Sequence, residues 1–383
     1  MTVTSAKGFR AAGVTAGLKG SGAPDLALVV NDGPVRAAAG VFTRNRVKAA
    51  PVLWSQQVLS AGQVDAVVLN SGGANACTGP EGFADTHRTA EAVADGLGTG
   101  AARVAVCSTG LIGVRLPMDL LLPGVDKAIS GLVDDGGPDA ARAIMTTDSV
   151  PKTASATRDG VTVGGMAKGA GMLAPALATM LVVVTTDAVA EPVALDEVLR
   201  EAVRTSFERV DSDGCLSTND TVLLLASGAS GVTPDREVLQ SLVSDVCLNL
   251  ARQLVADAEG ASKEVAVEVV GAASEDDAVE VARSVARNNL LKCALAGEDP
   301  NWGRVLAAVG TTAAAFEPDR LDVAMNGVQV CRSGGVGDPR ELVDLSGREV
   351  RITVDLHAGE VSATVWTNDL TEAYVHENSA YST

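Results

Sequence analysis

The chain has 383 residues, of which 46% are hydrophobic and 20% are charged, and its formal net charge is −18. This composition is typical of a folded globular protein, and the length allows one large domain or two ordinary ones. An acidic surface repels phosphates, so we expect no nucleic acid and no anionic membrane among its partners. The six cysteines are scattered and form no Cys-x-x-Cys pair, and no segment suggests a signal peptide or a membrane span. We therefore expect a cytoplasmic protein whose cysteines are reduced and lie in its core.

The first part of the chain predicts strands that end in loops of small residues. Strands are predicted at residues 27–30, 38–43, 64–69 and 104–107. The third strand leads into a small-residue loop at 70–79 and then a helix to about Leu97. The fourth ends in Ser108-Thr109-Gly110. Such a turn can direct a hydroxyl and a backbone N–H to one point, as an oxyanion hole requires, although an ordinary turn contains the same residue types.

The central stretch, residues 168–184, joins a segment of small residues to a buried strand. It begins with Lys168-Gly169-Ala170-Gly171, and an apolar, β-branched run begins at Met180. Thr179 stands at the join, where a threonine is usually just a strand residue. The nearest ionisable side chains are Lys168 and Asp187, so a reactive Thr179 needs a base from elsewhere. Cleavage of the chain before Thr179 would free an α-amine that could serve as this base.

In the second half, helices and strands alternate irregularly. Helices are predicted at residues 196–207, from Thr233-Pro234-Asp235 onwards, and from the capping box at 274–277 to about Asn289. Residues 299–304 are predicted to form a loop, and Asn326-Gly327 a hairpin turn. The three histidines show no metal-ligand spacing, so the sequence predicts no metal site. The whole pattern indicates a layered α/β or α+β architecture.

Taken together, these segments resemble the ornithine acetyltransferase family, the glutamate N-acetyltransferases of arginine biosynthesis. The specific part of the match is Lys168-Gly-x-Gly-Met172 followed by Ala178-Thr179-Met180-Leu181. The other matching segments are residues 8–14, 42–43, 49–52, 70–79, 108–110, 146–148, 217–221, 299–304 and the last eight residues. Gly73 departs from the family loop, where asparagine is expected, so the departure puts in doubt any role for a side chain at this position.

The resemblance implies an α+β sandwich of mixed sheets with helices outside, made by a precursor that cuts itself between Ala178 and Thr179. The products would be an α chain, residues 1–178, and a β chain, residues 179–383, which fold together as one unit. Two copies of each would form an α2β2 heterotetramer. The resemblance implies no cofactor, and it leaves open whether acetyl-CoA is also an acetyl donor.

The resemblance also implies roles for individual residues. Thr179 matches the nucleophile, and Thr109 and Gly110 match the oxyanion-hole pair. The positions that match substrate contacts are Thr146, Lys168, Thr179, Glu259, Asn378 and Thr383. The implied reaction moves the acetyl group of N2-acetyl-L-ornithine to L-glutamate through acetyl-Thr179. From their charges, we expect Lys168 to bind a substrate carboxylate and Glu259 to bind the ornithine ammonium.

Two other functions are compatible with parts of this pattern. An amidase or aminopeptidase could use the same self-processed Thr179 and pass the acyl group to water. A non-catalytic scaffold protein could carry Thr179 merely as a strand residue in an uncut chain. Dependence on glutamate would separate the first from an acetyltransferase, and an intact folded chain would favour the second.

Overall fold

The computed structural model describes residues 1–174 and 180–380, which form two compact units. Unit 1 comprises residues 1–208 and 215–254, and unit 2 comprises residues 209–214 and 255–380. Ala178, Thr179 and Thr383 lie outside the described residues. The division into an α chain and a β chain at this point therefore stays a prediction.

Unit 1 contains two β-sheets. The four-stranded sheet has the order β1-β2-β4-β5, and only its β4–β5 pair is parallel. Its strands are β1 (Phe9–Val14), β2 (Leu26–Asn31), β4 (Ala66–Asn70) and β5 (Val104–Ser108). The five-stranded sheet has the order β3-β9-β8-β7-β6, and only its β8–β9 pair is parallel. Its strands are β3 (Ala38–Phe42), β6 (Lys152–Arg158), β7 (Val161–Lys168), β8 (Leu181–Thr186) and β9 (Thr221–Ala226).

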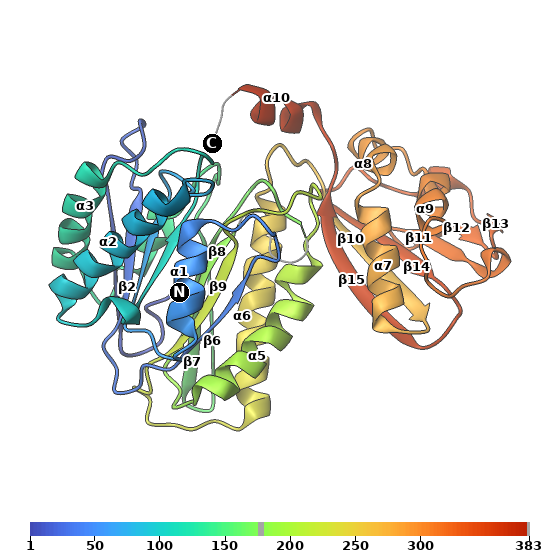
Figure 1. The fold of residues 1–383 in the computed structure, drawn as a ribbon. Coiled ribbons are helices and arrows are strands. Elements are labelled where there is room, and N and C mark those ends of the chain that lie inside the picture. The colour runs from blue at the N-terminus through green and yellow to red at the C-terminus, as the bar shows by residue number, and fades with distance from the viewer. Residues whose placement is uncertain (175–179, 381–383) are drawn as a thin grey trace. The chain divides into compact units, whose positions relative to one another are not determined.

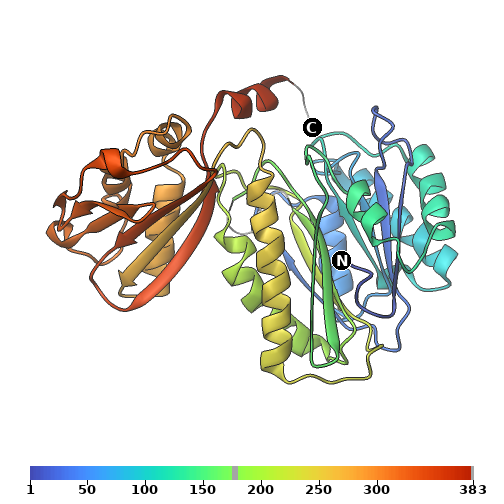
Figure 2. The ribbon, with the colours of Figure 1, turned by 180° about the vertical axis from the view of Figure 1, so that it is seen from behind.

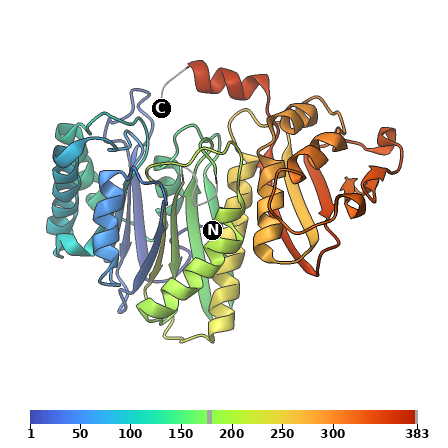
Figure 3. The same cartoon turned by 45° about the vertical axis from the view of Figure 1, so that its right-hand side comes forward.

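The two sheets of unit 1 face each other across a shared apolar core. Val67 and Leu69 of β4 belong to the same buried cluster as Leu181 of β8 and Leu223 of β9. All residues of β2, β4, β5, β8 and β9 are buried, which explains their near-continuous apolar sequences. Figure 3 shows these strands between outer layers of helices.

Helices cover both outer faces of unit 1. Its helices are α1 (Ala50–Leu59), α2 (Gly79–Leu97), α3 (Met118–Ser130), α4 (Gly137–Ala143), α5 (Pro192–Thr205) and α6 (Arg236–Ala256). Val93 of α2 and Val125 of α3 pack against Leu28 and Val106 on the outer face of the four-stranded sheet. Helices α5 and α6 cover the other sheet, and α1 and α4 pack beside the sheet edges (Figures 1 and 2). The predicted layered sandwich with helices outside is confirmed.

Unit 2 is a six-stranded mixed sheet, in the order β13-β12-β11-β14-β10-β15, with helices packed on it. Its strands are β10 (Glu264–Ala272), β11 (Asp322–Met325), β12 (Val328–Arg332), β13 (Gly335–Val336), β14 (Glu349–Asp355) and β15 (Val361–Asn368). Its helices are α7 (Glu275–Ala286), α8 (Asn289–Ala296), α9 (Trp302–Val309) and α10 (Glu372–Ala380). One apolar cluster joins α7 and α9 to the sheet through Val281, Val305, Val267 and Ile352.

Several local predictions can be compared with unit 2. Ser274 caps α7 by accepting a hydrogen bond from Asp277 N, as predicted. The predicted hairpin is confirmed, because β11 and β12 pair across Asn326 and Gly327, which have φ of 45° and 85°. The predicted loop at 299–304 is confirmed only for residues 299–301, since Trp302 begins α9. The predicted helix to about Asn289 ends at Ala286, and a separate helix, α8, follows it.

Two further predictions are also corrected. The long helix α6 begins at Arg236 rather than at Thr233. All six cysteines are free, but only Cys107, Cys247 and Cys331 are buried, whereas the other three are exposed. None of the helices in the described part of the chain has the length and apolar character that crossing a membrane requires.

Candidate active site

The predicted oxyanion pair, Thr109 and Gly110, follows directly after β5 in unit 1. Thr109 is buried, with 2% of its surface exposed. Gly110 has φ of +132°, a conformation that residues with a side chain rarely adopt. Among residues 1–174 and 180–380, the Gly110 N–H has no hydrogen-bond acceptor. A donor without a partner beside a hydroxyl is what an oxyanion hole offers to a developing negative charge.

Backbone hydrogen bonds from the 70–79 loop hold this pair in place. Gly73 N donates to Thr109 O at 3.0 Å, and Thr109 N donates to Asn70 O at 3.0 Å. The side chain of Asn219 joins the two segments by donating to Ser108 O at 2.8 Å and to Ala74 O at 2.6 Å. Gly73 departs from the family loop, but its contact with Thr109 is made by the backbone and needs no side chain at this position.

We expect alanine in place of Gly110 to lower kcat by about 10²-fold or more with little change in KM, as when an oxyanion donor is removed. The new Cβ would lie 2.8 Å from Gly73 N and 2.9 Å from Gly73 Cα, so the loop that presents the N–H must move. Gly113→Ala is the control, because Gly113 also has positive φ, +86°, but has open space around it. Steady-state kinetics test this prediction, and equal losses in both variants would contradict it.

Lys168, the last residue of β7, contacts the oxyanion pair. Its side chain is 2% exposed, and its Nζ donates to Thr109 Oγ1 at 3.2 Å. An ammonium group has no lone pair, so Thr109 Oγ1 must be the acceptor. The hydroxyl proton of Thr109 is then available to another acceptor, and the nearby positive charge strengthens it as a donor. The structure therefore brings together three predicted site residues, Thr109, Gly110 and Lys168.

Asp148 is a buried carboxylate that interacts electrostatically with Lys168. Its Oδ1 accepts from Lys152 Nζ at 2.6 Å and from Gly169 N at 2.7 Å, and its Oδ2 accepts from Thr146 N at 2.9 Å. Burial alone would raise the pKa of Asp148, but the charges of Lys168 and Lys152 outweigh it and lower the pKa to about 2. Asp148 is thus a buried carboxylate that places Thr146, a predicted substrate contact, beside the segment that begins at Lys168.

The depressed pKa of Asp148 predicts an acid-dependent loss of stability. The lowered pKa stabilises the fold fully above the usual value of 3.8, and this contribution disappears as the pH falls towards 2. The pKa shift corresponds to roughly 2 kcal/mol. In Asp148→Asn we expect the free energy of unfolding to be lower at pH 6 and to change less between pH 4 and pH 2. Urea unfolding across this pH range tests it, and parallel curves for the two proteins would contradict it.

A second buried carboxyl, Asp220, contacts the peptide group that follows position 179. Asp220 precedes β9 and is fully buried, and its Oδ1 accepts from Met180 N at 3.2 Å. Its Oδ2 has no hydrogen-bond partner among the described residues. Burial raises the pKa of Asp220 well above its usual range, although Met180 N, the hydroxyls of Ser217 and Thr43, and the charge of Lys168 oppose this. A buried carboxyl with a raised pKa therefore lies at the start of β8.

Two further predicted substrate contacts, Glu259 and Asn378, lie in unit 2. Asn378 of α10 donates from Nδ2 to Glu259 Oε2 at 2.9 Å and to Tyr374 O at 3.0 Å. The structure therefore pairs Glu259 with Asn378 and places the latter in a helix rather than in a frayed tail. Thr179 and Thr383 lie outside the described residues. No three His, Cys, Asp or Glu side chains come together as a metal site in the part of the chain that the structure describes.

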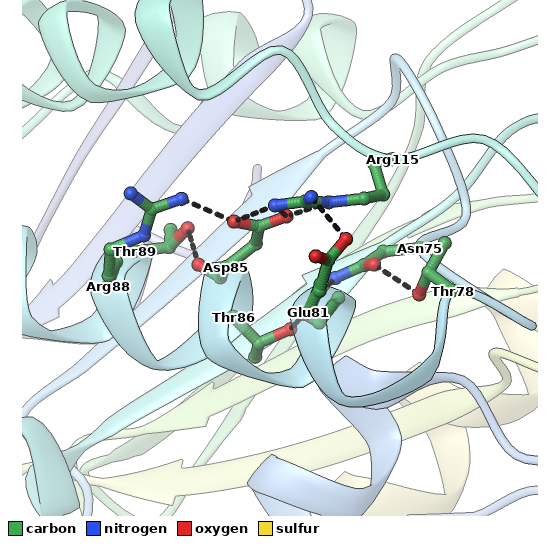
Figure 4. Close-up of polar contacts among 9 residues, drawn as sticks. Asn75, Thr78, Glu81, Asp85, Thr86, Arg88, Thr89 and Arg115 are labelled. Carbon is green, nitrogen blue, oxygen red and sulfur yellow. Dashed lines mark hydrogen bonds and ion pairs between the residues drawn. The ribbon is translucent and has the colours of Figure 1, made fainter.

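An ion-pair network joins helix α2 to Arg115, in the segment that follows Gly110 (Figure 4). Asp85 is fully buried, and its carboxylate accepts from Arg115 Nε at 2.8 Å and Nη2 at 3.0 Å, and from Arg88 Nη2 at 2.5 Å. Glu81 adds a 2.6 Å bond to Arg115 Nη1. At the start of α2, Asn75 donates to Thr86 Oγ1 and to Gly82 O, both at 2.9 Å. These bonds tie both loops around Thr109 and Gly110 to one helix.

We expect Asp85→Asn to lower the free energy of unfolding by about 2–3 kcal/mol, since hydrogen bonds to charged groups contribute about 1.5–3 kcal/mol each. The control is Asp139→Asn, which breaks the exposed 2.9 Å pair with Arg142 and should cost less than about 1 kcal/mol. Urea unfolding of both variants beside the wild type measures the difference. Equal costs would show that the Asp85 network adds nothing beyond an exposed ion pair.

The sequence reasoning did not assign roles to Asp148, Lys152 or Asp220. Asp148 and Asp220 lie in segments that were matched to the family, but their partners are far away in the chain or were not predicted. The available signal was weak, because each acid stands among small polar residues and could equally have been an exposed loop residue.

Comparisons with known proteins show the family to which the chain belongs. The model of the ArgJ family matches residues 10–383. The arginine biosynthesis bifunctional protein ArgJ of Streptomyces coelicolor is 71% identical over 382 residues and covers 100% of both chains. The protein of the same name from Thermobifida fusca is 64% identical over 383 residues, again covering 100% of both chains.

Among solved structures, ornithine acetyltransferase from Mycobacterium tuberculosis, crystallised in complex with ornithine, is 64% identical. It covers 47% of this chain and 96% of its own, with a TM-score of 0.45. Since the family model spans nearly the whole chain and full-length relatives exceed 60% identity, this chain belongs to the ArgJ family.

Proposed function

We propose that this chain is a glutamate N-acetyltransferase, which moves the acetyl group of N2-acetyl-L-ornithine to L-glutamate through an acetyl-Thr179 intermediate. The observation that carries the proposal is the 3.2 Å contact between Lys168 Nζ and Thr109 Oγ1, beside the N–H of Gly110, which has no acceptor among the described residues. Membership of the ArgJ family supports it, because the relatives are named as bifunctional proteins of arginine biosynthesis. We include acetyl-CoA as a second acetyl donor.

The proposed chemistry begins with self-cleavage between Ala178 and Thr179, which frees the α-amine of Thr179. This amine takes the hydroxyl proton as Oγ1 of Thr179 attacks the acetyl carbonyl. Thr109 and Gly110 donate to the resulting oxyanion. The amide C–N bond then breaks, the proton passes to the leaving nitrogen, and ornithine departs. In the second half, the amine of glutamate attacks the acetyl ester, the bond to Thr179 Oγ1 breaks, and Oγ1 regains a proton.

We further propose that the charged residues of the site recognise the two amino acids. Lys168 binds the α-carboxylate that N-acetylornithine and glutamate share, and Thr146 contacts the substrate beside it. Glu259 binds the ornithine ammonium, and Asn378 and Thr383 complete the substrate contacts. The Asn378–Glu259 hydrogen bond supports a joint role for these two residues.

The same proposal covers assembly and location. We propose that the α and β chains remain together and form an α2β2 heterotetramer. We propose a cytoplasmic location, supported by six cysteines that are all free, since thiols stay reduced in that compartment.

The deciding experiment incubates purified protein with N-acetylornithine, with and without glutamate, and measures N-acetylglutamate, ornithine and acetate by mass spectrometry. We expect N-acetylglutamate only when glutamate is present, parallel lines in double-reciprocal plots, and one acetyl group on the fragment that begins at Thr179. Release of acetate at the same rate without glutamate would instead identify an amidase, and no turnover of N-acetylornithine would contradict the proposal.

A further inference from the structure

A pocket of about 480 Å³ lies in unit 1 at the edge strand β3, beside α5. This volume is within the range of about 300–1,000 Å³ that small-molecule sites occupy. The lining residues are Gly40, Val41, Phe42, Thr43, Arg44, Lys48, Gln56, Arg200, Val203, Arg204 and Glu208. We call it the β3 pocket. It is distinct from Thr109, Gly110, Thr146 and Lys168, none of which lines it.

The lining of the β3 pocket is strongly basic in a chain whose net charge is −18. The lining cations are Arg44, Lys48, Arg200 and Arg204, and the one lining carboxylate, Glu208, pairs with Arg44 at 2.6 Å. A cluster of cations attracts anions even in a chain whose net charge is negative.

The ion pairs of these cations leave donors for a ligand. Arg200 Nε bonds to Asp196 at 2.7 Å, and Arg204 Nη2 bonds to Glu201 at 2.6 Å, so carboxylates that do not line the pocket balance these two charges. A guanidinium has five N–H donors, and the Arg200 bond uses one of them. Half-buried Lys48 has no hydrogen bond or ion pair within the part of the chain that the structure describes. Its ammonium group is therefore available to an anionic ligand.

The β3 pocket also has an apolar lining, which includes Gly40, Val41 and Phe42. A free phosphate or an amino acid would use the cations and leave this apolar lining uncovered. A nucleotide would use both, because its base covers apolar surface while its phosphates bind the guanidinium and ammonium groups.

The β3 pocket lies close to the reacting end of the five-stranded sheet. Phe42 pairs with Thr221, and Thr221 pairs with Leu181, so the three form one row across β3, β9 and β8. With neighbouring strands 4.7–4.9 Å apart, Phe42 and Leu181 are roughly 10 Å apart. Thr43, at the pocket, also donates from its N to Asp220 O at 3.0 Å, and Asp220 contacts Met180 N. A ligand bound here therefore needs only a flexible arm to reach the start of β8.

We propose that the β3 pocket binds the nucleotide phosphates of acetyl-CoA, whose long pantetheine arm delivers the thioester to the start of β8. The inference rests on the proposed function, specifically on acetyl-CoA as the second donor. In the transfer step, Thr179 Oγ1 bonds to the thioester carbon, the C–S bond breaks, and the thiolate takes the proton that left the hydroxyl. N-acetylornithine carries no phosphate and does not use the β3 pocket.

The test compares both acetyl donors in the variants Lys48→Glu and Arg200→Glu. We expect the KM for acetyl-CoA to rise about tenfold or more in each, while the KM for N-acetylornithine stays within about twofold. Arg158→Glu is the control, since Arg158 lies on β6, the opposite edge strand, and gives the same change in net charge. Acetyl-pantetheine, which lacks the nucleotide, should show equal KM values in wild type and variants.

A binding measurement separates this inference from the proposed function. Adenosine 3′,5′-bisphosphate should bind the wild type in calorimetric titrations, weaken with salt, and bind Lys48→Glu at least tenfold more weakly. Equal binding to both proteins, or equal rises in KM for both donors, would overturn the inference. Wild-type protein that uses N-acetylornithine but not acetyl-CoA would overturn it while leaving ornithine-dependent transfer intact. Failure of both donors, with the nucleotide still bound at the β3 pocket, would count against the proposed function instead.

Discussion

Thr179→Ala is expected to give a single uncut chain of 38.8 kDa with no acetyl transfer from any donor. The hydroxyl of Thr179 is needed twice, first to attack the carbonyl of Ala178 in self-cleavage and then to carry the acetyl group. Its loss also prevents release of the α-amine that serves as the base. Intact-mass measurement of denatured protein should show two wild-type fragments, beginning at Met1 and Thr179, and one full-length chain in the variant.

Thr179→Ser separates the role of the hydroxyl from that of the threonine side chain as a whole. Serine keeps the nucleophilic oxygen, so we expect cleavage and measurable transfer at reduced rates. A wild-type protein that stays uncut yet transfers acetyl groups would show that no free α-amine is required. A cleaved and active Thr179→Ala would place the nucleophile at another residue.

The elements that could be predicted from the sequence are those whose cause is local. The Asn326-Gly327 turn is one, because only a few residue types tolerate two successive positive φ angles. The cap at Ser274 is another, since its partner, Asp277 N, lies three residues away. The position of Thr109 and Gly110 directly after β5 was also predictable, because a buried strand and a Ser-Thr-Gly turn are adjacent in the chain.

The predictions that failed depend on packing between distant segments. Trp302 begins a helix because α9 packs on the unit 2 core, and the polar residues before it had suggested a loop. The long helix begins at Arg236 although Thr233 and Pro234 resemble a cap and a first turn. Local propensity sets only a weak preference at such boundaries, which tertiary contacts override.

The polar groups behind the oxyanion pair could not have been assigned from the sequence for the same reason. Lys168 meets Thr109 across 59 positions, and Met180 meets Asp220 across 40. These contacts exist because the two sheets of unit 1 bring the end of β5 close to the end of β7 and the starts of β8 and β9. As a result, the ammonium group of Lys168 lies near two buried carboxyls, Asp148 and Asp220. The surroundings lower the pKa of Asp148 and raise the pKa of Asp220.

Lys168→Met should lower kcat/KM for N-acetylornithine by about 10³-fold, the largest loss we expect in a protein that still cleaves itself. The change removes the donor to Thr109 Oγ1 at 3.2 Å, so the Thr109 hydroxyl is no longer directed towards the oxyanion, which alone costs about 10²–10³-fold in kcat. It also removes the charge that we propose binds the substrate carboxylate, so KM should rise as well. Steady-state kinetics on protein whose cleavage has been checked by mass measure both effects.

Lys152→Met is the matched control for this prediction. Lys152 is as deeply buried as Lys168 and also contacts Asp148, at 2.6 Å, but it is not hydrogen-bonded to Thr109. Either substitution leaves Asp148 with one lysine and the N–H groups of Thr146 and Gly169, so both variants should lose stability. Only Lys168→Met should lose most of its kcat, because only that lysine directs the Thr109 hydroxyl. If Lys152→Met lost as much kcat as Lys168→Met, the effect would come from Asp148, and Lys168 would not be part of the oxyanion machinery.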